Sequence, residues 1–84
     1  MGHLIRFKSS ADKELDALSE QQRIQIFRAI KNLANNPRPS GCKKLKSRDA
    51  YRIRVGDYRV IYEIHDNILV VLVIRIAQRQ EAYQ

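Results

Sequence analysis

Hydrophobic and polar residues alternate through residues 51–62, on both sides of the dipeptide Gly56-Asp57. Alternation with a period of two is typical of a strand, and a Gly-X pair between two such runs favours a β-hairpin with a type II′ turn. The pattern therefore predicts two antiparallel strands joined by these two residues. In this register the facing pairs are Val55 with Tyr58, Arg54 with Arg59, and Arg52 with Ile61.

The predicted hairpin carries its arginines on one of its two faces. Since side chains two positions apart share a face, Arg52, Arg54 and Arg59 are expected to project from the same side of the sheet. Arg54 and Arg59 face each other directly, and like charges in this relation cost roughly 0.2–1 kcal/mol. An anion lying across the three guanidinium groups would offset that cost, and a solvated polar face is the alternative. The hairpin tyrosines alternate with the arginines and are expected in the core: Tyr51, Tyr58 and Tyr62.

A short strand at residues 3–7 and two helices are predicted before the hairpin. Ser9 and Ser10 are candidate N-caps of the first helix, and Ser19 with Gln22 forms a capping box that opens the second. The apolar residues expected to form one buried stripe on the second helix are Ile24, Phe27, Ile30 and Leu33 or Ala34. The two helices are expected to pair antiparallel and to pack their apolar stripes on another surface.

After the hairpin, the run Ile68–Ile74 is apolar at every position and follows a turn at Asp66-Asn67. A strand that is apolar on both faces is typical of the centre of a sheet. We therefore expect one domain, residues 1–84, of the α+β class: a small, mostly antiparallel sheet with the N-terminal helix pair packed on one face. The opposite face, near the hairpin arginines, is expected to form a basic concavity with an apolar floor.

The charge of the chain is strongly positive, because sixteen Lys and Arg against nine Asp and Glu give a net charge of +7. Residues 42–59 hold seven basic and two acidic residues, so most of this charge lies in one segment. Such a concentration is the footprint of a polyanionic partner, either nucleic acid or an acidic protein. Four of the basic residues precede the hairpin and belong either to a solubilising loop or to an anion-binding surface: Lys43, Lys44, Lys46 and Arg48.

Several kinds of site lack support in the sequence. Cys42 is the only cysteine, and His3 and His65 show no spacing typical of metal ligands, so no metal site is expected. The three glycines are isolated, which argues against a glycine-rich phosphate loop, and no cofactor is expected. The longest apolar run is too short to span a bilayer and the N-terminus lacks the apolar segment of a secretion signal. We expect a cytoplasmic protein without a membrane partner.

The C-terminal tail is polar and places Tyr83 near Arg79, where an aromatic ring could stack on a base or pack on the edge of the sheet. The chain thus reads as a strand, two helices, a lysine-rich loop, the sequence YRIRVGDYRVIYEI, an apolar strand and a terminal Arg-x-x-x-Tyr. This order resembles the RelE/ParE toxin superfamily over nearly the whole chain, and the tyrosine- and arginine-rich hairpin is its most specific part.

The resemblance implies a RelE-like fold and a toxin that cleaves messenger RNA in the ribosomal A site and is neutralised by a cognate antitoxin. The implied reaction is attack of an RNA 2′-hydroxyl on its adjacent phosphate, without a metal or small-molecule cofactor. By position, Arg52 and Arg54 match the paired basic residues on the family's second strand, and Arg59 matches the arginine on the third. Arg79 and Tyr83 match the basic and aromatic residues of the tail.

The roles that the resemblance implies follow from the chemistry of these side chains. Arginine stays protonated, so the hairpin arginines are expected to hold the phosphate and stabilise the charge that develops on it. Tyr83 is expected to orient the nucleotide, and Arg79 to stabilise or protonate the leaving oxygen. The residues expected to bind RNA or the ribosome are Lys43, Lys44, Lys46 and Arg48.

Three classes of function remain open at this point. The first is a ribosome-dependent endoribonuclease, which the arginine cluster and Tyr83 favour. The second is a ParE-like inhibitor of DNA gyrase. The third is a catalytically weak protein of the same fold that binds only RNA or its antitoxin, which is favoured by Gln78 because many relatives carry a histidine at that position.

Overall fold

The chain folds into two helices and a five-stranded sheet, and the structure, a computed structural model, describes residues 2–78. In chain order the elements are β1 (Leu4–Phe7), α1 (Ser9–Asp16), α2 (Glu20–Asn32), β2 (Lys43–Lys44), β3 (Tyr51–Val55), β4 (Tyr58–His65) and β5 (Val70–Gln78). The predicted α+β class is therefore confirmed. No helix of the described part is long and apolar enough to cross a membrane.

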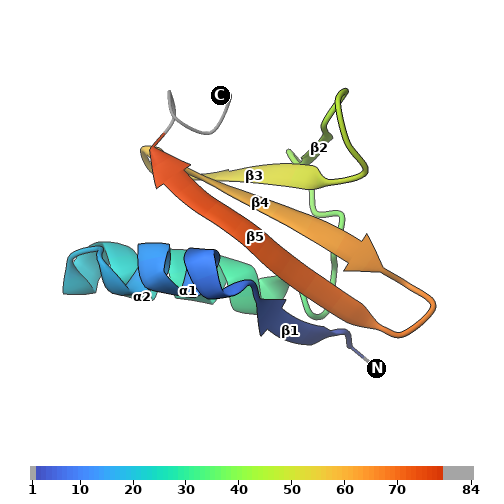
Figure 1. The fold of residues 1–84 in the computed structure, drawn as a ribbon, viewed down its shortest axis with the longest axis horizontal. Helices are drawn as coiled ribbons and strands as arrows, with labels where there is room; N and C mark the ends of the chain where they lie inside the picture. The colour runs from blue at the N-terminus through green and yellow to red at the C-terminus, as the bar shows by residue number, and fades with distance from the viewer. Residues whose placement is uncertain (1, 79–84) are drawn as a thin grey trace.

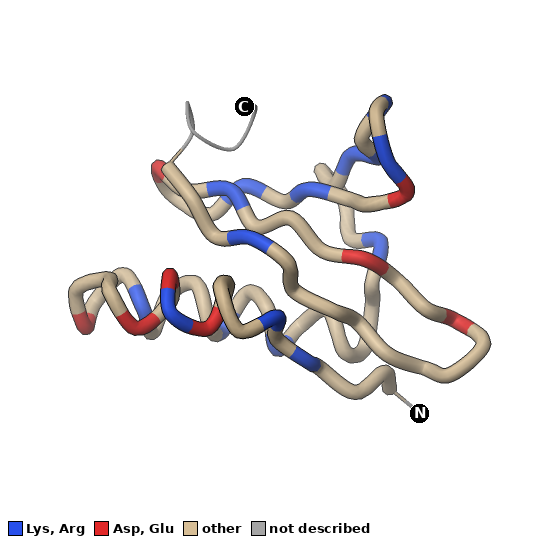
Figure 2. The backbone as a smooth tube through the Cα atoms, in the orientation of Figure 1, with Lys and Arg blue, Asp and Glu red and all other residues tan. Residues whose placement is uncertain are grey.

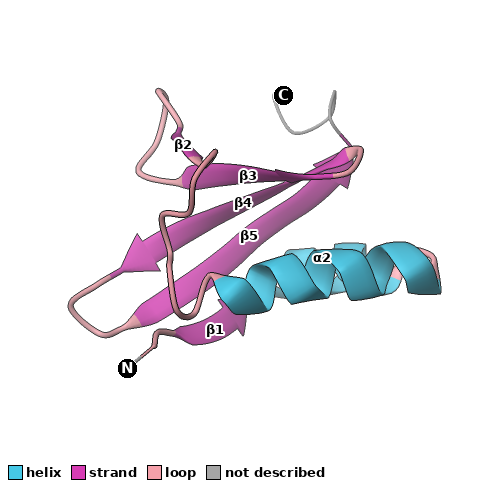
Figure 3. Cartoon of the chain, turned by 180° about the vertical axis from the view of Figure 1, so that it is seen from behind, coloured by secondary structure: helices cyan, strands magenta, loops and turns pink. Residues whose placement is uncertain are grey.

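The strands lie in the order β1-β5-β4-β3-β2. Only β1 and β5 are parallel among the paired strands of residues 2–78, and the other three pairings are antiparallel. Strand β2, which pairs with the start of β3, was expected to be loop. The two helices run antiparallel, side by side, on one side of the sheet (Figures 1 and 3).

The predicted hairpin of β3 and β4 is confirmed residue by residue. Arg54 faces Arg59, and the other facing pairs are those that the alternation predicts. Gly56 has a φ of 58°, whereas Asp57 has no positive φ, which is the combination that a type II′ turn requires. Glycine at the first turn position therefore fixes the register, and the register fixes which side chains share a face.

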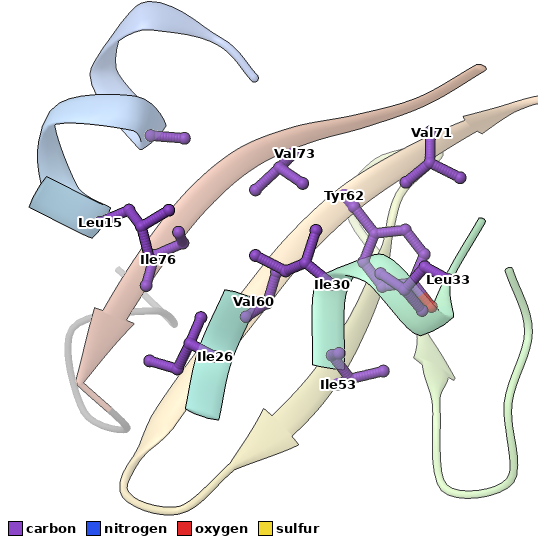
Figure 4. Packing of buried hydrophobic residues seen from close by; sticks show 11 residues of the cluster. Leu15, Ile26, Ile30, Leu33, Ile53, Val60, Tyr62, Val71, Val73 and Ile76 are labelled. Carbon is purple, nitrogen blue, oxygen red and sulfur yellow. The ribbon is translucent and has the colours of Figure 1, made fainter. Parts of the chain in front are cut away.

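The main core lies between the helices and the inner face of the sheet (Figure 4). The buried residues of this cluster are Ala11, Leu15, Ile26, Ile30, Leu33, Ile53, Val60, Tyr62, Val71, Val73 and Ile76. Tyr51 and Tyr58 pack against the cluster, so all three hairpin tyrosines lie on the core face as predicted. The hydroxyl of Tyr62 donates a hydrogen bond to the carbonyl of Pro37 at 2.7 Å, which satisfies its buried polar end.

The two helices begin in different ways. The side chain of Ser19 accepts a hydrogen bond from the backbone N–H of Gln22 at 3.3 Å, which confirms the predicted cap of α2. The side-chain amide of Gln22 instead accepts from the hydroxyl of Tyr58 at 3.4 Å. For α1 the predicted serine cap is wrong, because Lys8 occupies the N-cap position and no side chain caps the helix.

The buried stripe of α2 also differs from the prediction. Ile26, Ile30 and Leu33 are buried, whereas Ile24 and Phe27 are 50% and 44% exposed. Both sets of residues have helical spacing, and they share their C-terminal half. The hydrophobic pattern alone could not decide which set faces the sheet, because α2 carries more apolar residues than its inner face can hold.

Strand β5 begins later and runs further than the predicted range Ile68–Ile74. Ile68 and Leu69 lie in the turn after β4, where Leu69 has a φ of 55° and both side chains are largely exposed. The strand itself starts at Val70 and continues to Gln78. The apolar run is thus divided between a turn and a strand. Strand β5 pairs with β4 along its length but with β1 only in its first half.

A β-bulge interrupts the pairing of β5 with β4. Ile61 pairs with Arg75, whereas the next residue of β4 pairs with Val73, so Ile74 is an extra residue on β5. Because of this insertion, Val73 and Ile76 both pack in the main core although three positions separate them. The side chains of Ile74 and Arg75 are thereby both placed on the other face of the sheet.

Candidate functional site

A basic pocket of ≈ 690 Å³ opens on the face of the sheet opposite the main core. It is lined by Lys8, Ser10, Glu14, Lys43, Lys44, Leu45, Lys46, Ser47, Arg48, Arg52, Ile61, Ile74 and Arg75. Seven of these residues are Lys or Arg and one is a carboxylate. Figure 2 shows the basic positions along β3 and the segment before it. The apolar residues among them are Leu45, Ile61 and Ile74, which confirms the predicted basic concavity with an apolar floor.

Four residues of the basic pocket form one row across the sheet. Lys43 of β2 faces Arg52 of β3, which faces Ile61 of β4, which in turn faces Arg75 of β5. Neighbouring strands lie about 4.8 Å apart, so the row extends over roughly 15 Å. Three of the seven cations that line the pocket are therefore arranged as a line perpendicular to the strands.

Arg52 is the buried cation of this row. Ile53 packs in the core, so the alternation of β3 directs its neighbour Arg52 to the pocket face. Arg52 is 6% exposed, and its Nε has no hydrogen-bond partner among the described residues, nor does any carboxylate there form an ion pair with it. A buried charge without a partner is costly. The arrangement is the one expected where an external anion completes the site.

The other two hairpin arginines share the face of Arg52 but do not line its pocket. Arg54 is exposed, whereas Arg59 is 2% exposed. The three arginines thus lie on one face of the sheet, as expected. Their guanidinium groups do not share one open site, because Arg54 is exposed, Arg59 is buried and only Arg52 lines the pocket. Arg59 lies on central β4, between Arg54 and Ala77, while Arg54 lies near the end of β3.

The four residues predicted to bind RNA all line the basic pocket, and they are Lys43, Lys44, Lys46 and Arg48. Lys44 forms an ion pair with Asp49 at 3.5 Å, and Arg48 with Glu63 at 3.3 Å. Exposed pairs of this kind contribute at most about 1 kcal/mol, so an incoming anion can replace them. Arg79 and Tyr83 lie outside the described residues, and their roles stay predictions.

The structure adds residues that sequence reasoning missed, on the far side of β5. Arg75, together with Lys8, Ser10 and Glu14 at the start of α1, lines the same pocket. Only the bulge at Ile74 and the packing of α1 beside β5 bring them there. A cation directly after an apolar run was the single available signal, and it did not reveal on which face Arg75 lies.

Carboxylate and imidazole side chains are few around the pocket. Glu14 is the carboxylate among the described lining residues. The two histidines bond elsewhere: His3 contacts Asp66 and His65 contacts Glu63, each at 2.9 Å. The described residues also hold no group of three or more His, Cys, Asp or Glu side chains placed to bind a metal ion.

A second polar cluster, away from the pocket, ties the N-terminus to the loop after α2. Asp66 accepts hydrogen bonds from His3 at 2.9 Å and from Arg38 at 3.0 Å. These bonds lower the pKa of the Asp66 carboxyl, His3 having the larger effect. Arg38 also donates to the hydroxyl of Tyr51 at 3.3 Å and lies over its ring. The cluster links the N-terminal strand to the loop after α2 and includes no residue that lines the basic pocket.

The fold is shared with solved structures of a free toxin and of toxin–antitoxin complexes. The RelBE2 complex of Mycobacterium tuberculosis matches with a TM-score of 0.84 at 23% identity, over 94% of this chain and 100% of the matched chain. A double mutant of the Escherichia coli toxin RelE in the free state gives 0.82 at 27% identity, over 99% and 90%. The archaeal RelE–RelB complex of Pyrococcus horikoshii OT3 gives 0.83 at 26% identity, over 94% and 97%. No curated protein matches the chain.

The sequence model of the ParE toxin of type II toxin–antitoxin systems, parDE, matches residues 5–83. The matched range contains every residue that lines the basic pocket. The sequence match and the fold therefore agree with the resemblance that the hairpin sequence suggested. This chain belongs to the RelE/ParE superfamily, as a toxin of a type II toxin–antitoxin system.

Proposed function

We propose that this toxin is a metal-independent endoribonuclease that acts in the cytoplasm and cleaves messenger RNA in the A site of the ribosome. A 2′-hydroxyl attacks the adjacent phosphorus, the bond to the 5′-oxygen breaks, and the products are a 2′,3′-cyclic phosphate and a 5′-hydroxyl. The proton of the attacking hydroxyl leaves and the 5′-oxygen gains one. Negative charge builds up on the phosphorane oxygens between these events, so fixed cationic donors are what the reaction most needs.

The observation that carries this proposal is the buried Arg52 on the wall of the basic pocket. It is 6% exposed and has no ion-pair partner among the described residues, and six further Lys and Arg side chains line the same pocket. A guanidinium offers several N–H donors in a fixed plane that suits phosphate. Since its position is fixed by the core residue Ile53 beside it, little reorganisation is needed when charge develops.

The remaining residues are proposed to take the roles that the family resemblance implies. Arg54 and Arg59 face each other on the same side of the sheet and are proposed to stabilise the charged phosphate with Arg52. Arg79 is proposed to assist the leaving oxygen and Tyr83 to stack on the nucleotide. Because arginine is a poor acid and base, alignment of the substrate by the ribosome is proposed to supply much of the rate.

Cleavage of messages in a translation extract, mapped by primer extension, tests this function. Arg52→Gln is expected to lower the cleavage rate roughly 10²- to 10³-fold, the usual loss for one preorganised donor. Arg28→Gln is the matched control, because Arg28 is an exposed arginine on α2, across the sheet from the pocket. Cleavage by Arg52→Gln at the wild-type rate would show that the pocket is not the catalytic site.

A second candidate is inhibition of DNA gyrase, because the matching family model is that of ParE toxins. This function needs a protein-binding surface and no phosphate site. DNA breaks and filamentation after induction, with intact messages, would support it. Discrete cuts in messages without DNA damage would exclude it in favour of the endoribonuclease.

A cognate antitoxin is the proposed protein partner, since solved relatives include RelE–RelB complexes. Ile24 and Phe27 leave an exposed apolar strip on α2, and the ammonium of Lys31 lies 6.0 Å from the Phe27 ring centroid. An amphipathic, acidic segment would complement this surface. Its association with the toxin is expected to weaken with added salt to the extent that exposed charge pairs contribute.

A further inference from the structure

The basic pocket continues past β5 to the first turn of α1, which no predicted site residue occupies. Lys8 and Ser10 line this end of the pocket. The backbone N–H of Lys8 donates to the carbonyl of Val73 at 2.9 Å, so the start of the helix is fixed against β5. The first backbone N–H groups of a helix lack acceptors within it, and no side chain caps α1. Fixed N–H donors and an ammonium therefore lie together at one end of the pocket.

A second, independent observation shows that the same pocket is built for an anion. Arg52 is more than nine-tenths buried, and its Nε has no hydrogen-bond partner among residues 2–78. It lies in the row that runs from Lys43 across Ile61 to Arg75, and this row leads directly to α1. The distance from Arg52 to Arg75 along the row is two strand spacings, or roughly 10 Å. One anion at Arg52 does not reach the far end of the row, where Arg75 and Lys8 line the pocket.

Glu14 fixes Arg75 at that far end. Strand β1 ends at Phe7, opposite Val73, so the later part of β5 has no strand on this side. The Oε1 atom of Glu14 accepts the N–H of Ile76 at 2.9 Å, and its Oε2 atom lies 3.8 Å from the Nε of Arg75. A carboxylate in an anion site normally weakens binding. Here it satisfies an unpaired strand edge and orients a guanidinium whose other N–H groups remain available.

We propose that this end of the pocket is a second phosphate subsite for single-stranded RNA. One phosphate of the strand binds at Arg52 and Lys43, and another phosphate binds at Arg75, Lys8 and the backbone N–H groups that open α1. This proposal rests on the proposed function, because it takes RNA as the ligand. It adds that the RNA chain crosses the sheet along the row from Lys43 to Arg75. Glu14 acts as a positioning residue for Arg75.

Binding of fluorescently labelled oligonucleotides made of 2′-O-methyl RNA, which cannot be cleaved by 2′-hydroxyl attack, tests the second subsite. A length series from two to eight nucleotides is titrated by anisotropy at several salt concentrations. For the longer strands, Lys8→Gln and Arg75→Gln are each expected to weaken binding roughly 3- to 10-fold and to reduce the salt slope by about 0.7. For the dinucleotide, which has one phosphodiester, both are expected to bind as the wild type does. Lys13→Gln and Arg28→Gln, which remove the same charge at exposed helix positions, are the controls.

Glu14→Gln tests whether Glu14 positions Arg75 or acts only through its negative charge, because the two roles predict opposite changes in RNA affinity. Removing a negative charge from an anion site should strengthen binding if Glu14 acts only through its charge. If Glu14 positions Arg75, the variant binds long strands about as weakly as Arg75→Gln, and the double variant is no weaker than either. Tighter binding by Glu14→Gln would overturn the positioning role.

The outcomes distinguish the subsite from the proposed function. If Lys8→Gln and Arg75→Gln bind long strands like the wild type while Arg52→Gln is weakened, the second subsite is wrong and the nuclease function stands. If the wild type binds no RNA but binds a poly-glutamate peptide in a manner sensitive to Arg52→Gln, the pocket is a protein site and both proposals fall. Lys8 is exposed and its variant is expected to fold, so the test does not depend on Arg75→Gln alone.

Discussion

Replacement of Arg52 by methionine is expected to slow cleavage strongly while leaving the fold equally stable or more stable. Methionine keeps most of the length of the side chain and removes the buried charge. Arg52 is 6% exposed, beside Ile61 in the row across the sheet, so an apolar side chain has an apolar neighbour there. The stability and the activity of this variant should therefore change in opposite directions.

The magnitude follows from the burial of the guanidinium. Replacing buried ionic groups by apolar ones is often neutral or stabilising by about 1–4 kcal/mol. The lower end applies here, because Arg52 still borders an open pocket. About 1 kcal/mol corresponds to a rise in Tm of roughly 4–8 °C for a domain of this size. Loss of one fixed donor should lower the cleavage rate roughly 10²- to 10³-fold.

Thermal unfolding followed by circular dichroism, together with message cleavage in a translation extract, gives both quantities. Arg38→Met is the matched control, since Arg38 pairs with Asp66 at 3.0 Å and lies over the ring of Tyr51. That control should melt slightly lower than the wild type and cleave normally. A Tm for Arg52→Met several degrees below the wild type would refute the reasoning, because it would mean that the guanidinium is already satisfied within the fold.

Three other predictions concern the fold. Gly56→Ala should lower the free energy of unfolding by about 1 kcal/mol in urea titrations, because alanine disfavours the φ of 58° at this position. Among the described residues, no atom beyond its chain neighbours lies within 4 Å of an added Cβ, so backbone strain alone sets this cost. Tyr62→Phe should lower it by about 1–3 kcal/mol, since the carbonyl of Pro37 loses its 2.7 Å partner. Asp66→Asn should be less stable than the wild type at neutral pH. Because contact with His3 lowers the pKa of Asp66, that difference should shrink as pH falls below about 4, which melting curves across pH would detect.

The hairpin could be predicted from the sequence because its determinants are local. Gly56 sets the turn, the turn sets the register, and the alternation of arginine and tyrosine then assigns each side chain to a face. The capping serine of α2 was predictable for the same reason, since Ser19 acts on a backbone group three residues away. Predictions of this kind need no knowledge of where other elements lie.

The remaining features depend on contacts between distant segments. The choice of Ile26 over Ile24 as a buried residue is made by the sheet beneath α2. The alternation along β4 assigns Arg59 to a face but does not predict its burial, and the presence of Lys8 in the pocket depends on how α1 lies beside β5. Local pattern assigns the identity and the face of a side chain, whereas its environment is set by tertiary packing.

The extra residue in β5 lets two consecutive side chains, Ile74 and Arg75, face the pocket, whereas a regular strand would direct one of them into the main core. Before the extra residue, Val71 and Val73 at odd positions pack in the main core, whereas after it Ile76 at an even position does. Ile74 and Arg75 lie between Val73 and Ile76, so two consecutive residues contribute an apolar side chain and a cation to the same pocket. Natural variation at these two positions can therefore change which ligands the pocket accepts without repacking the main core.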